Sequence, residues 1–223
     1  METRVSSGHL ELIDKLVSQR IIKSQKVIDA FKALDRAFFI PKSTLSPYSD
    51  TPHSIGHNAT ISAPHIHGMA LELLKDHLRP GTKSLDIGSG TGYLTLAMAY
   101  MQNFQGKAVG IEHIPELVDE SNKVMRRVCS QAEGTVEFHT SDGRNGWEAG
   151  APYTTIHVGA SSGEIPQALV RQLDYGGRLV IPVGEYLMSQ YITIVDKDQE
   201  GNIHQTKSTA VNYVPLCDKD SQE

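Results

Sequence analysis

The sequence predicts an α/β fold: a mostly parallel, twisted sheet with helices on both faces and an antiparallel hairpin at its C-terminal end. Three observations support this prediction. Short apolar strands alternate with helices from residue 83 onward, and such alternation requires crossover connections between parallel strands. A glycine-rich turn joins the first of these strands to the helix that follows it. The last two strands, 190–195 and 206–214, have no helix between them, which is typical of a hairpin.

The first 80 residues lie before the alternating part and differ from it. Between residues 6 and 36, apolar residues recur at the three- and four-residue spacing of amphipathic helices. Residues 41–65 hold four prolines, three histidines and many hydroxyl side chains. We expect them to form an ordered but irregular segment. Pro64 opens a further helix that runs to residue 78.

The alternating part predicts strands over 83–87, 107–111, 136–139, 153–158 and 178–182, and helices over 94–101, 115–131 and 167–173. In such a sheet the loops after the carboxyl ends of the parallel strands meet at one edge, where ligands bind. The length of 223 residues suits a single domain. Within it we expect residues 1–80 to form N-terminal helices and a covering segment, and residues 81–218 to form the ligand-binding core.

Composition excludes several classes of protein. Hydrophobic residues make up 39% and charged residues 21% of the chain, which is typical of globular proteins. The net charge of −5 and the pI near 6.0 argue against a nucleic-acid partner. No window approaches the roughly 20 apolar residues of a spanning helix, so no membrane partner is expected. Two cysteines favour free thiols in the cytosol, and without an exposed heptad pattern we expect a monomer.

The glycine-rich turn points to S-adenosylmethionine (AdoMet) as the ligand. Gly88, Gly90 and Gly92 form a G-x-G-x-G turn, in which a ligand can approach the backbone closely. Glu112 ends the second strand and is placed to accept both hydroxyl groups of an adenosine ribose. Asp86 would repel the pyrophosphate of a dinucleotide but suits the ammonium and sulfonium groups of AdoMet. A dinucleotide and a turn without any ligand are the alternatives.

A further acidic residue follows the third strand. Asp142 is placed to accept a hydrogen bond from the exocyclic amine of adenine, with the Gly143 amide nearby. An Asp-Gly pair by itself is a common turn. Its position among the converging loops favours a role in binding the cofactor.

Beyond the glycine turn, the sequence resembles the protein-L-isoaspartate (D-aspartate) O-methyltransferase family. The most specific part is Ser54-Ile55-Gly56 followed by Ala59-Thr60-Ile61-Ser62-Ala63-Pro64-His65-Ile66-His67. The other similar motifs are 85–92, 110–114, 142–144, 157–160, 166–169, 176–179 and 213–216. The resemblance covers the chain from about residue 8 to residue 218, and it implies a Rossmann-like, AdoMet-dependent methyltransferase fold.

The resemblance implies that the protein methylates the free carboxylate of L-isoaspartyl and D-aspartyl residues in damaged proteins and peptides. The ester then closes to a succinimide that partly hydrolyses to aspartate. Ser62 is the implied catalytic residue. The implied contacts to AdoMet and its product S-adenosylhomocysteine are Ala59, Thr60, Ile61, Ser62, His67, Asp86, Gly88, Ser89, Gly90, Glu112, His113, Asp142 and Gly143. Those to the substrate are Ile61, Ser62, His157, Val158, Gly159, Ala160 and Val214.

The chemistry of a carboxylate acceptor explains why no general base stands out. A carboxyl group has a pKa near 4, so it is already ionised at pH 7 and needs no base to attack a methyl group. The enzyme must align two groups at about 3 Å and exclude water. We therefore expect Ser62 to hold a carboxylate oxygen through its hydroxyl group, and His157 to donate a hydrogen bond near the substrate.

Two positions depart from the family's pattern. Thr154 stands where relatives carry aspartate, and Glu112 stands where relatives often carry the shorter aspartate. Neither changes the expected fold or reaction. His65 and His67 diverge at the start of a helix, so we expect no metal site. An AdoMet enzyme with another acceptor and a non-catalytic AdoMet-binding module are the alternative functions.

Overall fold

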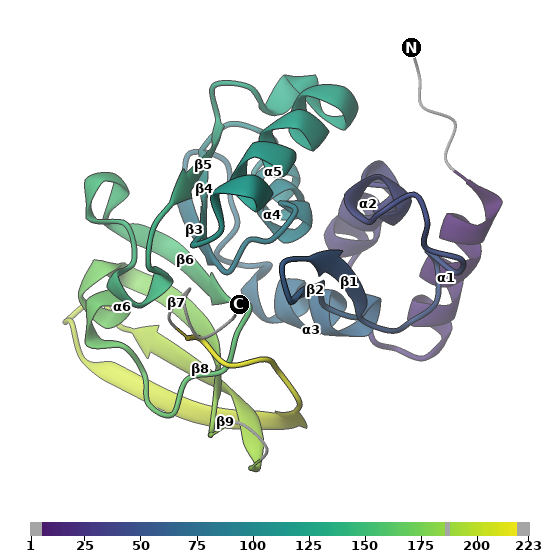
Figure 1. Cartoon of the computed structure of the whole chain (residues 1–223). Coiled ribbons are helices and arrows are strands. Elements are labelled where there is room, and N and C mark those ends of the chain that lie inside the picture. Colours follow the sequence, from purple (N-terminus) through teal and green to yellow (C-terminus); the bar gives the residue numbers. More distant parts are fainter. Residues whose placement is uncertain (1–5, 186–187, 218–223) are drawn as a thin grey trace.

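The computed structural model describes residues 6–185 and 188–217. Its centre is a seven-stranded sheet in the order β5-β4-β3-β6-β7-β8-β9 (Figure 1). The strands are β3 (Lys83–Ile87), β4 (Lys107–Glu112), β5 (Val136–Thr140), β6 (Tyr153–Val158), β7 (Leu173–Val183), β8 (Gln190–Lys197) and β9 (Ile203–Val211). β3 to β7 pair in parallel, whereas β8 and β9 pair antiparallel. The mixed sheet and its C-terminal hairpin confirm the predicted fold class.

Helices cover both faces of this sheet (Figure 1). One face carries α3 (Pro64–Leu74), α4 (Tyr93–Met101) and α5 (Pro115–Val128), with α1 (Ser7–Ser18) and α2 (Gln25–Ala33) packed outside them. On the other face, α6 (Gln167–Gln172) packs against β7. Short 3-10 helices occur at Arg36–Phe39, Ser130–Ala132, Gly143–Asn145 and Glu148–Gly150.

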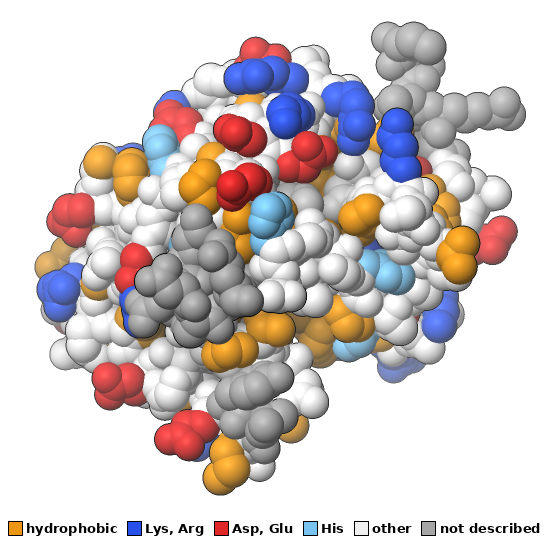
Figure 2. Space-filling view, in the orientation of Figure 1, with side chains coloured by type: hydrophobic (Ala, Val, Ile, Leu, Met, Phe, Trp, Pro, Cys, Tyr) orange, Lys and Arg blue, Asp and Glu red, His pale blue; other side chains and the backbone are white. Residues whose placement is uncertain are grey.

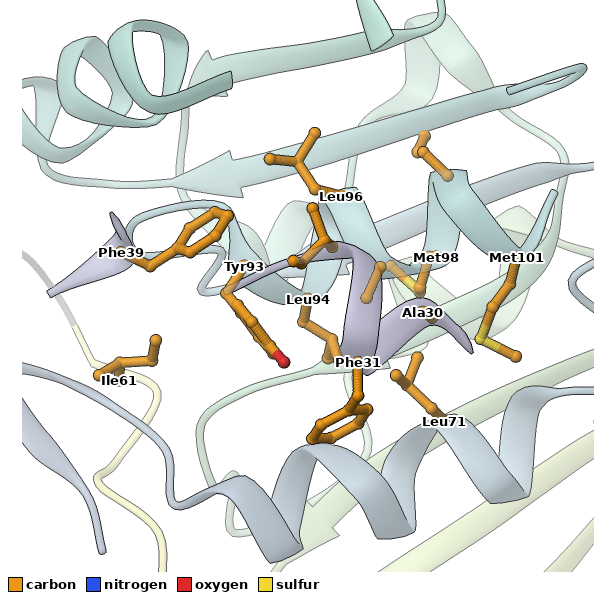
Figure 3. Close-up of a cluster of buried hydrophobic side chains, with 14 of the residues drawn as sticks. Ala30, Phe31, Phe39, Ile61, Leu71, Tyr93, Leu94, Leu96, Met98 and Met101 are labelled. Carbon is orange, nitrogen blue, oxygen red and sulfur yellow. The ribbon is translucent and has the colours of Figure 1, made fainter. Parts of the chain in front are cut away.

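A large buried cluster joins the N-terminal helices to the helix that follows the glycine turn (Figure 3). Tyr93, the first residue of α4, contacts Phe31 of α2 edge to face with ring centroids 6.1 Å apart. It contacts Phe39 in the same geometry at 5.1 Å. Such aromatic pairs contribute about 1 kcal/mol beyond their buried area. The cluster therefore fixes the N-terminal helices against the glycine turn.

The segment 41–65 contains a short hairpin that the sequence patterns did not predict. β1 (His53–Gly56) and β2 (Ala59–Ile61) pair antiparallel. His57 and Asn58 join them, each with a φ of 51°, which is the backbone of a type I′ turn. Buried Arg36 donates from Nη2 to the carbonyl oxygen of Ser62 at 2.7 Å, just after this hairpin. The end of this segment is thus anchored to the 3-10 helix Arg36–Phe39.

The predicted boundaries of four elements differ most from the structure. α3 ends at Leu74 and not at residue 78. α5 ends at Val128 and not at residue 131, because the extended φ of −149° at the next residue leaves the helix. β7 already begins at residue 173, because Gly176, with a φ of +69°, lies within the strand and does not end it. β9 spans 203–211 in place of 206–214, so the chain leaves the sheet earlier than expected.

Candidate active site

Two small cavities lie at the carboxyl ends of the parallel strands. The first, the Glu112 cavity, is lined by Ile55, Ala59, Thr60, Ile87, Gly88, Gly90, Ile111, Glu112, His113, Gly143, Gly159, Ala160 and 214–217. The second, the Asp86 cavity, is lined by Thr60, Ile61, Ser62, His67, Asp86, Gly88, Ser89, Gly90, Thr91, Tyr93, Leu94, His157 and Gly159. Four wall residues are common to both, so the cavities adjoin each other across the glycine turn.

The shape of the glycine turn requires its glycines. Gly88, Gly90 and Gly92 have φ values of 72°, 53° and 83°, in a region that other residues rarely adopt. A Cβ atom at Gly92 would lie 2.6 Å from the ring of Phe138. The Gly88 amide donates to the carbonyl oxygen of Ile111 at 2.8 Å, which ties the turn to the end of β4.

Glu112 is fixed at the end of β4 by backbone amides. Its Oε2 atom accepts a hydrogen bond from the Gly90 amide at 3.1 Å, and its Oε1 atom accepts one from the Ile114 amide at 3.2 Å. A carboxylate has about four acceptor positions, so these bonds leave others open toward the cavity. The side chain is 8% exposed. Glu112 is therefore an oriented, largely desolvated acceptor for hydroxyl donors.

Asp86 lies at the base of its cavity and is 1% exposed. Its Oδ1 atom is 2.8 Å from Nδ1 of His157, and its Oδ2 atom accepts from the hydroxyl group of Thr95 at 2.6 Å. His157 is adjacent because Asp86 pairs with it in the register of β3 and β6. The sequence predicted a contact with the cofactor; the structure adds that each oxygen already accepts one hydrogen bond inside the protein. Asp86 thus fixes the ring of His157 in the cavity wall.

Three buried polar atoms in the wall of the Asp86 cavity have no hydrogen-bond partner within the described part of the chain. They are the hydroxyl oxygens of Ser89 and Thr91 and Nδ1 of His67. Buried polar groups are nearly always paired in folded proteins, so three orphans in one wall fit a polar ligand. Burial holds the pKa of His67 well below its ordinary value, and the nearby Arg36 cation lowers it further. A neutral imidazole at this position suits a cationic ligand.

Ser62 lies where the Asp86 cavity meets an open groove. It follows β2 and precedes α3, and it lines both spaces. The groove has a volume of about 1000 Å³ and runs between the start of α3, the start of β8, the end of β9 and residues 212–214. Ile66 and Met69 contribute apolar walls, and Figure 2 shows hydrophobic side chains gathered near α3 on this face. The groove is large enough for a segment of a peptide.

The structure brings the predicted site residues to these cavities and the groove, with two exceptions. Val158 is fully buried in the core on the other face of the sheet, because successive residues of a strand point to opposite faces and its neighbour His157 faces the cavity. Asp142 is turned toward Arg144, whose Nη2 and Nε atoms donate to it at 2.7 and 3.1 Å. The Asp142 carboxylate is not part of either cavity wall, although Gly143 is.

Several wall residues were missed from the sequence. Thr91 and Tyr93 line the Asp86 cavity, and Ile55 lines the Glu112 cavity. Thr91 lies within the glycine turn itself, so its position was the available signal. Residues 215–217 also line the Glu112 cavity, and no sequence pattern indicated this because their place depends on where β9 ends.

The described residues contain no group of three or more His, Cys, Asp or Glu side chains that could hold a metal ion. None of the helices that the structure describes is long and apolar enough to cross a membrane.

The fold and the cavities together define the class of protein. A seven-stranded α/β sheet carries a G-x-G-x-G turn at the end of β3 and an oriented glutamate at the end of β4. A neutral histidine and orphan hydroxyl groups lie beside them. This combination suits a nucleoside cofactor that carries positive charge, and it is that of an AdoMet-dependent methyltransferase.

Comparison with known proteins specifies the family. The family model for Protein-L-isoaspartate(D-aspartate) O-methyltransferase (PCMT) matches residues 7–221. The protein-L-isoaspartate O-methyltransferase of Triticum aestivum is 48% identical over 224 residues, which cover 97% of this chain and 96% of that protein. The Caenorhabditis elegans protein of the same name is 46% identical over 218 residues, covering 97% and 95%. The chain therefore belongs to the PCMT family.

A solved structure agrees with this assignment. The crystal structure of a Plasmodium falciparum protein, described as a protein-L-isoaspartate O-methyltransferase in complex with S-adenosyl-L-homocysteine, superimposes with a TM-score of 0.86. It is 31% identical, and the match covers 95% of this chain and 99% of that one. The resemblance inferred from the sequence is confirmed.

Proposed function

We propose that this protein transfers the methyl group of AdoMet to the free carboxylate of L-isoaspartyl and D-aspartyl residues in damaged proteins and peptides, and so starts their repair through a succinimide. The observation that carries the proposal is the position of Ser62. This residue lies in the wall of the Asp86 cavity and in the wall of the open groove. A donor held in the cavity and an acceptor held in the groove therefore meet at Ser62.

The residues of the two cavities fit AdoMet in chemistry and position. Glu112 has acceptor positions for the two ribose hydroxyl groups. The orphan atoms of Ser89, Thr91 and His67 are available to the polar methionine part, and neutral His67 adds no repulsion to its positive charge. When bound, AdoMet supplies a methyl group that its sulfonium charge activates.

The chain's own contribution to the reaction is alignment. The acceptor carboxylate is ionised at neutral pH and needs no general base. The Ser62 hydroxyl group donates to one carboxylate oxygen, and the backbone of Ser62 is fixed because its carbonyl oxygen accepts from Arg36. His157 is held by Asp86 and closes the cavity beside Ser62. Holding both groups in one geometry supplies most of the rate.

The open groove supports a protein or peptide as the acceptor. Its volume of about 1000 Å³ far exceeds the space in the two cavities, and it is open to solvent. His65 of α3 and Tyr191 of β8 both line it. An isoaspartyl residue would place its free carboxylate at Ser62 while its flanking residues lie along the groove.

One experiment tests this function. The protein is incubated with methyl-labelled AdoMet and two peptides of one sequence, of which one contains isoaspartate and the other aspartate. We expect base-labile label in the isoaspartyl peptide alone. Equal labelling of both peptides, or of neither, would contradict the proposal.

A monomeric, cytosolic protein is also part of the proposal. Both cysteines, Cys129 and Cys217, are free thiols in the structure, which fits a reducing compartment. Light scattering after gel filtration should give a mass near the 24.5 kDa of one chain. A mass of twice that value would contradict the monomer.

A further inference from the structure

The segment 212–217, here called the C-terminal strap, forms a wall of both ligand spaces. It begins where β9 ends at Val211. Residues 214–217 line the Glu112 cavity, and residues 212–214 line the open groove. Val214 borders both. The position of this one segment therefore affects the space for the cofactor and the space for the peptide.

The loop that follows β6 holds the strap through hydrogen bonds. The Ser161 amide donates to the carbonyl oxygen of Val214 at 2.8 Å, and the Leu216 amide donates to the carbonyl oxygen of Ser161 at 2.7 Å. The hydroxyl group of Ser161 also donates to the Val214 carbonyl, at 3.3 Å. These bonds follow a parallel bridge between Ser161 and Pro215. A single residue, Ser161, thus makes all of these hydrogen bonds to the strap.

Gln190 forms hydrogen bonds both to the strap and to Ser161 in the loop after β6. It is the first residue of β8 and is 1% exposed. Its Oε1 atom accepts from the Tyr213 amide at 2.7 Å, and its Nε2 atom donates to the Ser161 hydroxyl oxygen at 2.9 Å and to the Tyr213 carbonyl oxygen at 3.3 Å. One carboxamide therefore satisfies both backbone groups of Tyr213 and holds Ser161 at the same time.

We propose that Gln190 is a positioning residue for both ligands, because it fixes the strap through Tyr213 and Ser161 and so holds Val214 in the walls of both the Glu112 cavity and the groove. The inference rests on the proposed function of these two spaces. Gln190 also lines the groove, but its amide atoms are engaged inside the protein, so its effect on the cofactor space passes through the strap. Only a side chain with an acceptor and two donors at this length can make the same three bonds.

The role has a kinetic signature that distinguishes it from a purely structural one. Loss of the carboxamide leaves the buried Tyr213 amide without an acceptor, and the strap must shift to recover one. Because the strap walls both spaces, AdoMet affinity and peptide KM should weaken together. The rate at saturation should change little, since Ser62 and His157 are fixed by Arg36 and Asp86.

The chain offers a closely matched control in Gln172. Its Oε1 atom accepts from the Trp147 amide at 2.8 Å, and its Nε2 atom donates to the Asn145 carbonyl oxygen at 2.9 Å and to Glu148 at 3.1 Å. It is 4% exposed. It thus holds a loop in the same way, but residues 145–148 line neither cavity nor the groove.

The experiment compares Gln190→Met with Gln172→Met. Calorimetry measures the Kd for AdoMet, and steady-state kinetics with an isoaspartyl peptide measures KM and kcat. For Gln190→Met we expect Kd and KM each to rise about tenfold, with kcat within about threefold of the unmodified protein. Gln172→Met should leave all three values within about twofold at a similar loss in Tm.

Unchanged Kd and KM in Gln190→Met, or the same increases in Gln172→Met, would overturn the inference. If Gln190→Met does not fold, Ser161→Ala replaces it. This variant removes one acceptor of Gln190 Nε2 and should raise both constants about threefold. Unchanged constants in Ser161→Ala also overturn the inference. Failure of the proposed function can be distinguished from failure of this inference. An unmodified protein that binds AdoMet but does not methylate the peptide contradicts the function, whereas the AdoMet Kd still tests Gln190.

Discussion

Glu112→Gln tests how the protein recognises the cofactor ribose. Both carboxylate oxygens accept from backbone amides, from Gly90 at 3.1 Å and from Ile114 at 3.2 Å. A glutamine side chain has one oxygen and one NH₂ group. Whichever way it is turned, the NH₂ group meets an N–H donor, and one of these two hydrogen bonds is lost. The remaining oxygen must then serve one backbone amide and every ribose hydroxyl group that donates, because the NH₂ group cannot accept.

The expected magnitude follows from these bonds. A hydrogen bond to a charged group contributes about 1.5–3 kcal/mol. Since about 1.4 kcal/mol corresponds to a tenfold change in affinity, AdoMet should bind about 10–100-fold more weakly. The free energy of unfolding without ligand should fall by about 1–3 kcal/mol, because a buried amide loses its acceptor.

Isothermal calorimetry with AdoMet and with S-adenosylhomocysteine measures both affinities. We expect the two Kd values to rise by the same factor, because the change lies at the ribose and not at the sulfur. Glu137→Gln on the neighbouring β5 is the control, since its side chain is 45% exposed and pairs with Lys107. A change below about twofold for Glu112→Gln, or weakening of AdoMet alone, would refute the reasoning.

Three other predictions concern the acceptor site, the glycine turn and a buried histidine. Ser62→Ala should lower kcat about 10–100-fold while AdoMet affinity stays nearly the same; a collapse of affinity would instead make Ser62 a cofactor ligand first. Gly92→Ala should lower the free energy of unfolding in urea by about 3 kcal/mol, because its Cβ would meet Phe138 at 2.6 Å. Gly134→Ala, with a similar φ and nothing within 4 Å, should cost only about 1 kcal/mol; equal losses would argue against the clash. Burial lowers the pKa of His9 from 6.5, so the unfolded chain takes up the proton first and stability falls as the pH drops below about 6.5; His9→Gln should flatten this loss between pH 6.5 and 5, and an unchanged slope would contradict it.

Much of the fold was accessible from the sequence because its signals are local. The strands and helices from residue 83 to residue 158 follow the apolar periodicity closely, and the glycine turn marks the first crossover. The hairpin of β1 and β2 was missed because its strands have only four and three residues, too few for a periodic pattern. The end of β9 was misplaced because apolar residues continue into the strap without a turn signal.

The site residues, too, divide into those that local sequence signals predict and those that depend on contacts between distant parts of the chain. The glycines and Glu112 could be assigned from spacing, because their places depend on one strand and the turn after it. The partners of Asp86 could not, since His157 reaches it only through the pairing of β3 with β6. Val158 was expected at the site from the resemblance, but strand alternation turns its side chain into the core. Gln190 gave no signal at all, because its role depends on contacts with Ser161 and Tyr213, 29 and 23 residues away.

The central claim is that the methyl group goes to the free carboxylate of an isoaspartyl residue positioned at Ser62. Tandem mass spectrometry can locate it, with a peptide that contains one isoaspartyl, one aspartyl and one glutamyl residue and that is quenched at acidic pH before the ester decays. The account predicts a single added methyl group, carried by the isoaspartyl residue. A methyl group on the aspartyl or glutamyl side chain, on the C-terminal carboxylate or on a nitrogen atom would contradict it.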